Sequence, residues 1–275
     1  MWTLTGFADE ISDDFAEQLD LLTTLGVKHL EFRSAWGQNI LLLSHEQLTQ
    51  AKQMLDEAGI AVSSVGSPVG KQLITEDVEL HVQGMKHAVE LAHFFGARYI
   101  RGFSFFMPEG DDPAIHRDEV LRRMRLFVEI AEAGDVILLH ENEKDIYGDT
   151  PERCLDLLTS IDSPNFKAII DPANYVQCGV KPFDEAYPMM REHTVYMHMK
   201  DAIAGTPEVV PVGEGDGQVP QLIHALKESG YDGFFSLEPH LGDYTAWGAM
   251  SGPDLWTKAH AALMRLFEAE GISYR

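Results

Sequence analysis

The sequence predicts a single (β/α)8 TIM barrel, an α/β fold that occupies residues 1–275 as one domain. Three observations support this prediction. Short apolar runs rich in β-branched and aromatic residues recur along the chain, and eight of them have the length of a buried strand. Amphipathic helical stretches separate these runs, and a glycine often follows the helical stretch. The length of 275 residues and the apolar content of 45% suit a barrel with a substantial core.

The eight predicted strands leave room for a helix between consecutive members. They are Thr3–Phe7, His29–Arg33, Val62–Gly66, Tyr99–Phe103, Val136–His140, Phe166–Ile170, Val195–Met199 and Phe234–Leu237. Alternating strands and helices imply right-handed crossovers and a parallel sheet. Eight such units favour closure into a barrel over an open, doubly wound sheet. The Rossmann alternative also lacks its phosphate loop, since Gly6–Glu10 contains no G-x-G-x-x-G run.

Glycines mark the ends of the predicted helices and define the repeat. Gly26, Gly59, Gly96, Gly134 and Gly230 are each expected to take the left-handed conformation at a helix C-terminus. Their first three intervals are 33, 37 and 38 residues, and the last, of 96 residues, is close to three units of 32. Repeated β-loop-α units would produce such spacings.

Three helix starts carry capping signals. Ser44 begins a capping box that includes Gln47. Thr150 is expected to cap a helix whose first residue is Pro151. The segment 252–254, Gly-Pro-Asp, is expected to open a last helix that runs to about Glu270.

Charge and composition disfavour several classes of function. The formal charge of −23, from 21 basic and 44 acidic residues, would repel nucleic acid, and no basic cluster offsets it. The first ten residues lack a signal-peptide pattern, and no run of about 18 apolar residues predicts a membrane span. We therefore expect a cytoplasmic protein without nucleic-acid or membrane partners. Cys154 and Cys178 form no paired motif and are expected to be incidental thiols.

Four acidic or imidazole side chains, of the types that bind metals, lie at or just past the C-terminal ends of the last four predicted strands. They are Glu141, Asp171, His198 and Glu238. In (β/α)8 barrels the active site lies at this face, so the four side chains are expected to face one pocket. The mixed oxygen and nitrogen set suits Mn²⁺, our first candidate, or Mg²⁺, and tolerates Co²⁺ or Zn²⁺. A single acidic residue at a strand end usually caps a helix or is solvated, so the prediction rests on the conjunction.

Short motifs at the same strand ends add a resemblance that covers nearly the whole chain. They are Leu139–Asn142, Ile170–Asn174, His198–Asp201, Ser236–Pro239 and, in the loop after the seventh strand, Gly213–Asp216. In this order and spacing they resemble the xylose isomerase-like superfamily of sugar phosphate isomerases and epimerases. The resemblance implies that the four residues bind the metal and that Glu141 and Glu238 also act as acid and base. It allows a homo-oligomer, because members of the superfamily are often dimers or tetramers.

The chemistry expected of this site is proton transfer next to a carbonyl group. The metal would stabilise an enediolate formed from a ketose or related hydroxy-carbonyl compound. One glutamate would remove a proton and the other return it, which gives an epimer or, at the neighbouring carbon, an isomer. Glu214 and Asp216 would repel a phosphate from the glycine-rich loop, so a non-phosphorylated sugar or polyol derivative is expected.

Four side chains are candidates for substrate binding, each with an alternative role. Lys200 would contact the substrate or pair with an acidic neighbour. Arg101 would bind a substrate oxygen or form a buried pair with Glu31 or Glu141. His240 would reach a sugar hydroxyl or cap the following loop. Asn174 stands where ketose 3-epimerases usually carry histidine, and because an amide is no proton shuttle, the specific 3-epimerase assignment is weakened.

For seven further polar and aromatic residues the sequence leaves two alternatives, a role in the site or ordinary packing. They are Glu31, Arg33, His140, Glu143, Trp36, Phe105 and Phe106. The aromatic members would line the substrate or pack between loops.

Three other functions compete with the isomerase or epimerase. A lyase similar to 3-dehydroshikimate dehydratase would use the same metal and expel water, with Lys200, Arg101 or Lys71 binding a substrate carboxylate. A phosphodiesterase similar to endonuclease IV would need more histidine ligands and a basic face, which the net charge opposes. A non-catalytic sugar-binding barrel would not need the four ligands, all of which are present.

Overall fold

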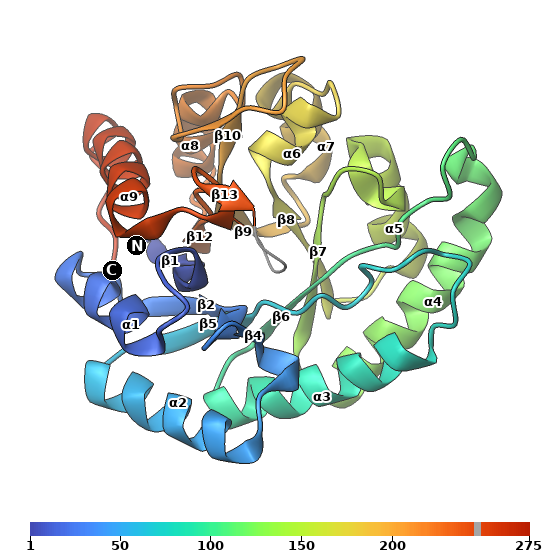
Figure 1. Cartoon of the computed structure of the whole chain (residues 1–275). Helices are drawn as coiled ribbons and strands as arrows, with labels where there is room; N and C mark the ends of the chain where they lie inside the picture. The colour runs from blue at the N-terminus through green and yellow to red at the C-terminus, as the bar shows by residue number, and fades with distance from the viewer. Residues whose placement is uncertain (245–248) are drawn as a thin grey trace.

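The computed structural model describes residues 1–244 and 249–275, and their strands form the predicted barrel (Figure 1). Eight parallel strands make one sheet in these residues, with hydrogen-bonded neighbours in the order β1-β12-β9-β8-β7-β6-β5-β2. They are β1 (Thr3–Gly6), β2 (His29–Phe32), β5 (Ala61–Val65), β6 (Tyr99–Gly102), β7 (Ile137–Glu141), β8 (Phe166–Ile170), β9 (Thr194–Met199) and β12 (Phe234–Leu237). Every strand end lies within one residue of its predicted position, so the predicted fold class and strand order are confirmed.

Helices follow the strands and cover the outside of the barrel (Figure 1). The longer ones are α1 (Phe15–Thr24), α2 (His45–Ala58), α3 (Glu79–Phe95), α4 (Pro113–Ala133), α5 (Pro151–Ile161), α8 (Val219–Glu228) and α9 (Gly252–Ala269). Between β8 and β9 the covering layer consists of α6 (Pro172–Gln177), the π-helical turn η4 (Pro182–Ala186) and α7 (Tyr187–Met190). In the described ranges, no helix is both long and apolar enough to span a membrane.

Short elements that the sequence analysis did not predict lie mostly in the segments after the barrel strands. They are the hairpins β3 (Ser34–Ala35) with β4 (Gln38–Asn39), β10 (Asp201–Ala202) with β11 (Val209–Val210) and β13 (Asp243–Tyr244) with β14 (Ala249–Met250), and the turns η1 (Ala8–Glu10), η2 (Ile40–Leu42) and η3 (Tyr147–Asp149). Elements of two or three residues are too short for a periodic pattern to reveal. They add structure to the loops at the C-terminal end of the barrel.

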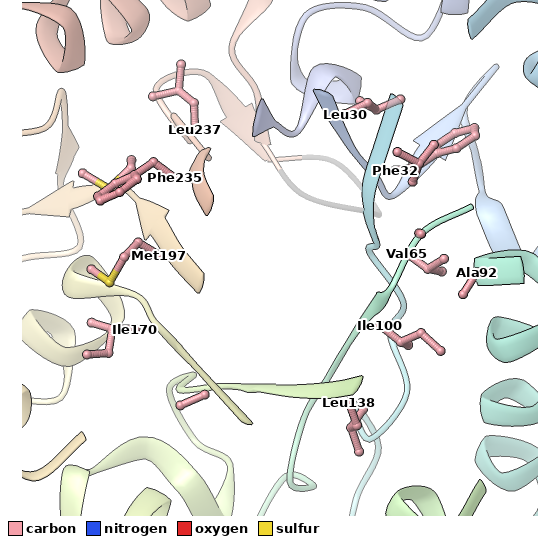
Figure 2. Packing of buried hydrophobic residues seen from close by; sticks show 14 of the residues in the cluster. Leu30, Phe32, Val65, Ala92, Ile100, Leu138, Ile170, Met197, Phe235 and Leu237 are labelled. Carbon is pink, nitrogen blue, oxygen red and sulfur yellow. The ribbon is translucent and has the colours of Figure 1, made fainter. Parts of the chain in front are cut away.

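Apolar residues form two layers around the sheet. The main layer lies between strands and helices, where Leu30, Val65, Ile100, Leu138 and Phe235 point away from the barrel centre (Figure 2). A smaller cluster lies inside the barrel and joins Ile137, Leu139, Ile169 and Tyr196. The interior cluster fills the barrel below the strand ends that carry the candidate site.

The first strand is paired on both sides with the end of the chain. β1 pairs in parallel with β12 on one side. On the other side the amide of Arg275 donates to the carbonyl of Trp2 at 2.9 Å, and the amide of Leu4 donates to the carbonyl of Arg275 at 3.0 Å. In the described part of the chain no ladder joins β1 to β2, so the C-terminal residues complete the edge of β1 at this seam.

The capping predictions are confirmed in part. Ser44 and Gln47 form the complete capping box at the start of α2. Pro151 is the first residue of α5, but the side chain of Thr150 makes no capping hydrogen bond there. Pro151 supplies no amide hydrogen and has a φ suited to a first turn, so this helix starts without a side-chain cap.

The prediction of a left-handed conformation is correct for four of the five glycines and wrong for Gly134. Gly134 has a φ of −91°, and the left-handed residue is its neighbour Asp135, with a φ of 50°. Glycine is required here for space, because a Cβ at position 134 would lie 2.4 Å from Val89 Cγ1 of α3. The end of α4 therefore packs directly against α3.

Replacing Gly134 with alanine is expected to lower the free energy of unfolding by about 1–3 kcal/mol, the usual cost of overpacking. The change Val89→Ala should relieve most of that cost, so the double variant would show a coupling of about 1 kcal/mol or more. Urea denaturation followed by circular dichroism measures both values. Gly59→Ala is the control, because its Cβ meets no atom within 4 Å and only its φ of 66° is strained. A cost of Gly134→Ala that persisted in full in the Val89→Ala background would refute the packing explanation.

Candidate metal centre and active site

The candidate site residues share the inward side of their strands, because successive strand residues point alternately to the helices and to the barrel interior. On β7, Leu139 belongs to the interior cluster, so Glu141 points inward and His140 outward. On β9, Tyr196 is in the same interior cluster, and His198 and Lys200 continue its side. The strand alternation therefore brings residues from several strands to one mouth.

Glu141, Asp171, His198 and Glu238 meet at this mouth. One ligand atom of each lies within 4.8 Å of the others, and all four side chains are buried. His198 Nδ1 is 3.1 Å from Glu141 Oε1, 3.4 Å from Glu238 Oε2 and 3.9 Å from Asp171 Oδ2. Glu141 ends β7, Asp171 caps α6 directly after β8, His198 lies on β9 and Glu238 follows β12. The structure thus brings together the four residues that the sequence placed at strand ends.

The charges of the cluster depend on buried cations that offset the cost of burial. Burial opposes ionisation of Glu141, but His198 and Arg101 outweigh it and lower the pKa of Glu141 to about 2. Burial likewise opposes ionisation of Glu238, and Lys200 and His240 hold its pKa well below its usual value. Burial raises the pKa of Asp171 to about 7, against the attraction of Lys200. Two of the three carboxylates are therefore held in the charged form.

The donor set fits a divalent cation. Asp171 Oδ2 is buried and accepts no hydrogen bond of regular geometry from the described residues. Three carboxyl groups and an imidazole nitrogen then converge on one small space, which costs free energy unless a cation neutralises it. A divalent ion there would favour the charged form of each carboxylate, Asp171 included. Oxygen-rich sites with one imidazole are common for Mn²⁺ and Mg²⁺.

Lys200 and Arg101 both contact the cluster through ion pairs. Lys200 Nζ lies 2.9 Å from Asp171 Oδ2 and 2.9 Å from Glu238 Oε2. Arg101 donates to Glu141 Oε2 at 3.3 Å and lies 3.9 Å from Glu238 Oε1. Of the partners that the sequence left open for Arg101, the structure therefore shows the pair with Glu141.

Asn174 forms hydrogen bonds with residues at the ends of β7 and β8. Its side-chain amide donates to the carbonyl of Asn142 at 2.9 Å and to Glu141 Oε1 at 3.4 Å. Its backbone amide donates to Asp171 Oδ1 at 2.9 Å. Asn174 thus touches two members of the cluster and orients both carboxylates.

A second set of polar residues surrounds Glu238, and the sequence analysis named two of its members, Arg33 and His240. Arg33 on the inward side after β2 donates to Asp9 Oδ2 at 2.7 Å and to Glu238 Oε1 at 3.2 Å. His240 Nε2 lies 3.4 Å from Glu238 Oε1 and 3.4 Å from Glu10 Oε1. The sequence left the role of Arg33 open, and its contact with Glu238 assigns it to the site. The contribution of Asp9 and Glu10 depends on the turn η1 and carries no sequence signal.

The phenyl ring of Phe7 packs against the imidazole and two of the guanidinium groups of the site. Its buried ring lies edge-to-face with His198 at a centroid distance of 5.2 Å. The guanidinium carbons of Arg33 and Arg101 lie 4.4 and 4.8 Å from the ring centroid, so both cations pack against this ring. Sequence reasoning assigned no role to Phe7.

Several residues that the sequence left open lie outside the cluster. His140 contacts Ser104 Oγ at 2.9 Å on the outward side of β7, and burial lowers its pKa to about 4. Glu143 accepts from Lys71 at 2.8 Å. Of the aromatic residues, Phe105 packs on Phe127 and Trp36 on Phe15, and Phe106 forms backbone bridges to neighbouring loops.

The glycine-rich loop after β9 is folded around a carboxylate of this chain. Asp201 accepts hydrogen bonds from the amides of Gly213, Gly215 and Gly217 at 2.9, 3.1 and 2.8 Å. A Cβ at Gly215 or Gly217 would lie within 2.6 Å of Asp201 Oδ1, so glycine is needed for this close approach. The amides that a phosphate would use are occupied by Asp201.

The fold and the site together define a (β/α)8 barrel with a buried acidic and histidine cluster at its C-terminal mouth. The chain belongs to the xylose isomerase-like TIM barrel family, whose model matches residues 19–266.

Among characterised relatives, the chain is similar to proteins of two activities. It is 23% identical to 3-dehydroshikimate dehydratase of Bacillus anthracis over 230 residues, which cover 78% of this chain and 81% of the relative. It is 26% identical to L-ribulose-5-phosphate 3-epimerase UlaE of Escherichia coli over 273 residues, which cover 92% of each protein. The family therefore contains both epimerases and dehydratases.

Solved structures show the same fold at low sequence identity. A D-tagatose 3-epimerase-like protein matches with a TM-score of 0.79 and 18% identity, over 97% of each chain. A xylose isomerase-like TIM barrel protein from Mycobacterium smegmatis, in complex with magnesium, matches with a TM-score of 0.71 and 19% identity, over 96% of this chain and 97% of the other.

Proposed function

We propose that this protein is a divalent-metal-dependent isomerase or epimerase of a non-phosphorylated ketose or a related hydroxy-carbonyl compound. The observation that carries the proposal is the cluster of Glu141, Asp171, His198 and Glu238, in which two glutamates face one metal-sized space. Glu141 and Glu238 come from β7 and β12, which are separated by β8 and β9 in the sheet. They therefore approach a bound substrate from two sides.

The proposed mechanism uses the two glutamates as base and acid. A divalent cation supplies Lewis acidity, which stabilises the negative charge that develops on the substrate when a carbon next to its carbonyl loses a proton. Mn²⁺ is the first candidate, with Mg²⁺ supported by the related protein that contains it. One glutamate removes the proton, and the other delivers a proton from the opposite side. Delivery to the same carbon gives an epimer, and delivery to the neighbouring carbon gives an isomer.

The cationic side chains around the cluster stabilise the ionised form of the two glutamates, which is the form that acts as a base. Lys200 and Arg101 hold Glu238 and Glu141 ionised, so either can accept a proton, and the contacts fix the direction of each carboxylate. Asn174 orients Glu141 through its side-chain amide. Lys200, Arg101, Asn174 and His240 line the same mouth and are the side chains that we propose to contact substrate hydroxyl or carbonyl oxygens.

Two observations support a substrate without phosphate. The amides of the loop after β9 are bound to Asp201, and the neighbouring Glu214 and Asp216 add negative charge. The three buried cations Arg33, Arg101 and Lys200 are each paired with carboxylates of this chain. A phosphate would have to displace those pairs, whereas sugar hydroxyls can share them. Because one relative is an epimerase of L-ribulose 5-phosphate, the substrate screen includes a phosphorylated ketose.

The second candidate is a lyase of the 3-dehydroshikimate dehydratase type. It is favoured by the similarity to the Bacillus anthracis protein and by Arg33 and Arg101, which both pack on Phe7 and could turn toward a substrate carboxylate. This reaction also begins with proton removal next to a carbonyl, but water leaves instead of a proton returning.

The deciding measurement is mass spectrometry of the Mn²⁺-loaded protein in D₂O with ketoses, a phosphorylated ketose, keto-acids and 3-dehydroshikimate. We expect one non-phosphorylated ketose or hydroxy-carbonyl compound to gain one deuterium next to its carbonyl and to appear as an epimer or isomer. Loss of water from 3-dehydroshikimate would identify the lyase. Exclusive turnover of the phosphorylated ketose would contradict the substrate class while keeping the chemistry. Unchanged substrates with each of the four metals would favour a sugar-binding role.

A further inference from the structure

Glu31 crosses the interior of the barrel to reach the histidine of the cluster. It lies on β2, whereas His198 lies on β9 on another side of the sheet. Glu31 Oε2 is 3.2 Å from His198 Nε2 and accepts a hydrogen bond from Ser236 Oγ at 2.6 Å. Ser236 and His198 are register partners on β12 and β9, so one carboxylate oxygen is held by two adjacent strands. Glu31 is fully buried.

The His198 ring is therefore fixed with different partners at its two nitrogens. Nε2 faces Glu31, while Nδ1 faces Glu141, Glu238 and Asp171. Phe7 packs edge-to-face on the ring at an interplanar angle of 84°, and Tyr196 packs on it at 77°, which limits rotation. The two ring nitrogens therefore have different surroundings: Nε2 faces a single carboxylate, and Nδ1 faces the cluster of proposed metal ligands.

We propose that Glu31 is a positioning residue for the metal centre: it holds the Nε2 proton of His198, so that the lone pair of Nδ1 points to the divalent cation. The inference rests on the metal centre proposed above. It adds a residue from the second barrel strand that does not itself lie in the four-residue cluster.

Two physical arguments support this role. A histidine binds a metal through one neutral nitrogen, and a carboxylate that accepts from the other nitrogen fixes the tautomer and increases the basicity of the ligand. A buried carboxylate is also costly, and an apolar residue of similar volume would usually be as good for stability. A glutamate that crosses the barrel to contact this imidazole, with hydroxyl groups beside it, therefore has its best explanation in what it does to the imidazole.

The inference predicts a selective loss of metal affinity. Glu31→Ala is expected to weaken Mn²⁺ binding about 10- to 100-fold, the usual effect of removing such a partner of a ligating histidine. Glu31→Gln keeps an acceptor oxygen without the charge and should recover part of the affinity. Ser236→Ala leaves Glu31 in place but less firmly held, and should have a smaller effect in the same direction. Isothermal titration calorimetry with Mn²⁺ measures the dissociation constants, after circular dichroism has shown that each variant is folded.

Ser63→Ala is the matched control. Ser63 lies inside the same barrel and bonds to Thr5 at 2.8 Å and to the Tyr196 hydroxyl at 2.9 Å, without touching the cluster. Its loss perturbs the polar interior of the barrel as Glu31→Ala does, and we expect the Mn²⁺ affinity to stay within about twofold of the wild type, because no ligand partner of the kind that tunes a metal site is removed.

A measurement on the unmodified protein makes the inference independent of variant folding. In ¹⁵N-histidine-labelled, Mg²⁺-loaded protein, the His198 resonances are expected to show a protonated Nε2 and an unprotonated Nδ1. A protonated Nδ1, or a folded Glu31→Ala protein that binds Mn²⁺ as tightly as the wild type, would overturn the role of Glu31 alone. A wild-type protein that binds neither ion would overturn the metal centre and this inference with it.

Discussion

Glu141→Gln and Glu238→Gln are each expected to lower turnover by about 10³-fold or more in the presence of saturating Mn²⁺, which is within the range for loss of a general acid or base. Glutamine keeps the size of the side chain and one oxygen for a cation, but it cannot accept a proton from carbon. Because the amide carries no charge, it also removes one member of a crowded set of carboxylates. Folding should therefore survive, and the melting temperature should change little. Steady-state turnover on the substrate found in the D₂O screen measures the effect.

The two variants also separate the roles of the two glutamates. If they serve opposite faces, each variant should lose net epimerisation yet still exchange deuterium into the one epimer whose proton faces the remaining glutamate. Glu143→Gln is the matched control: it lies two residues past Glu141, pairs with Lys71 and is half-buried, and we expect its turnover to stay within a few-fold of the wild type. Full activity in either of the first two variants would contradict the two-base mechanism.

Chelation of divalent cations is expected to abolish activity and to lower the melting temperature. Mn²⁺ added back at about 100 times its dissociation constant would stabilise the folded state by about 2.7 kcal/mol. For a domain of this size that corresponds to roughly 5 °C or more. The physical reason is the repulsion among Glu141, Asp171 and Glu238, whose oxygens lie within 4.8 Å of one another and of His198. Activity and differential scanning fluorimetry after dialysis against a chelator measure the two effects.

An Asp171→Ala variant is the control for this experiment. It removes one ligand and the contact with Lys200, so its melting temperature should no longer respond to Mn²⁺ at that concentration. A thermal shift of equal size in the wild type and in Asp171→Ala would place the binding of the ion elsewhere. Full activity in the chelated protein would rule out a metal-dependent reaction.

The sequence predicted the fold and the four-residue cluster for the same reason. Parallel strands of one barrel end at one face, so residues at the strand ends lie close together whatever loops follow them. The four ligand candidates were singled out because they occur together at four successive strand ends and because the motifs around them resemble a known family. They are Glu141, Asp171, His198 and Glu238. Lys200 and Arg101 could be directed inward by alternation, but whether each contacts substrate or an acidic partner depends on distances across the barrel.

The sequence left Glu31 and Arg33 open between a role in the site and ordinary packing for a geometric reason. It gave no signal for Asp9 and Glu10. Alternation tells which side chains of a strand point inward, but the tilt and stagger of the strands decide which inward residues stand at the same height. Glu31 meets His198 only because β2 and β9 are offset in the observed way. Gly134 was misread for a related reason, since the close approach of α4 to Val89 is a packing contact between helices and leaves no local sequence pattern.

The pairing of β1 has a consequence for the time course of biosynthesis. β1 leaves the ribosome more than 200 residues before its partners β12 and Arg275. Until they arrive, the backbone groups of residues 2–6 must remain hydrated or find temporary partners. Closure then joins segments more than 200 residues apart, a slow kind of event in folding. A nascent chain stalled before β12 would thus expose strand edges, and this is the stage at which a chaperone would have most to protect.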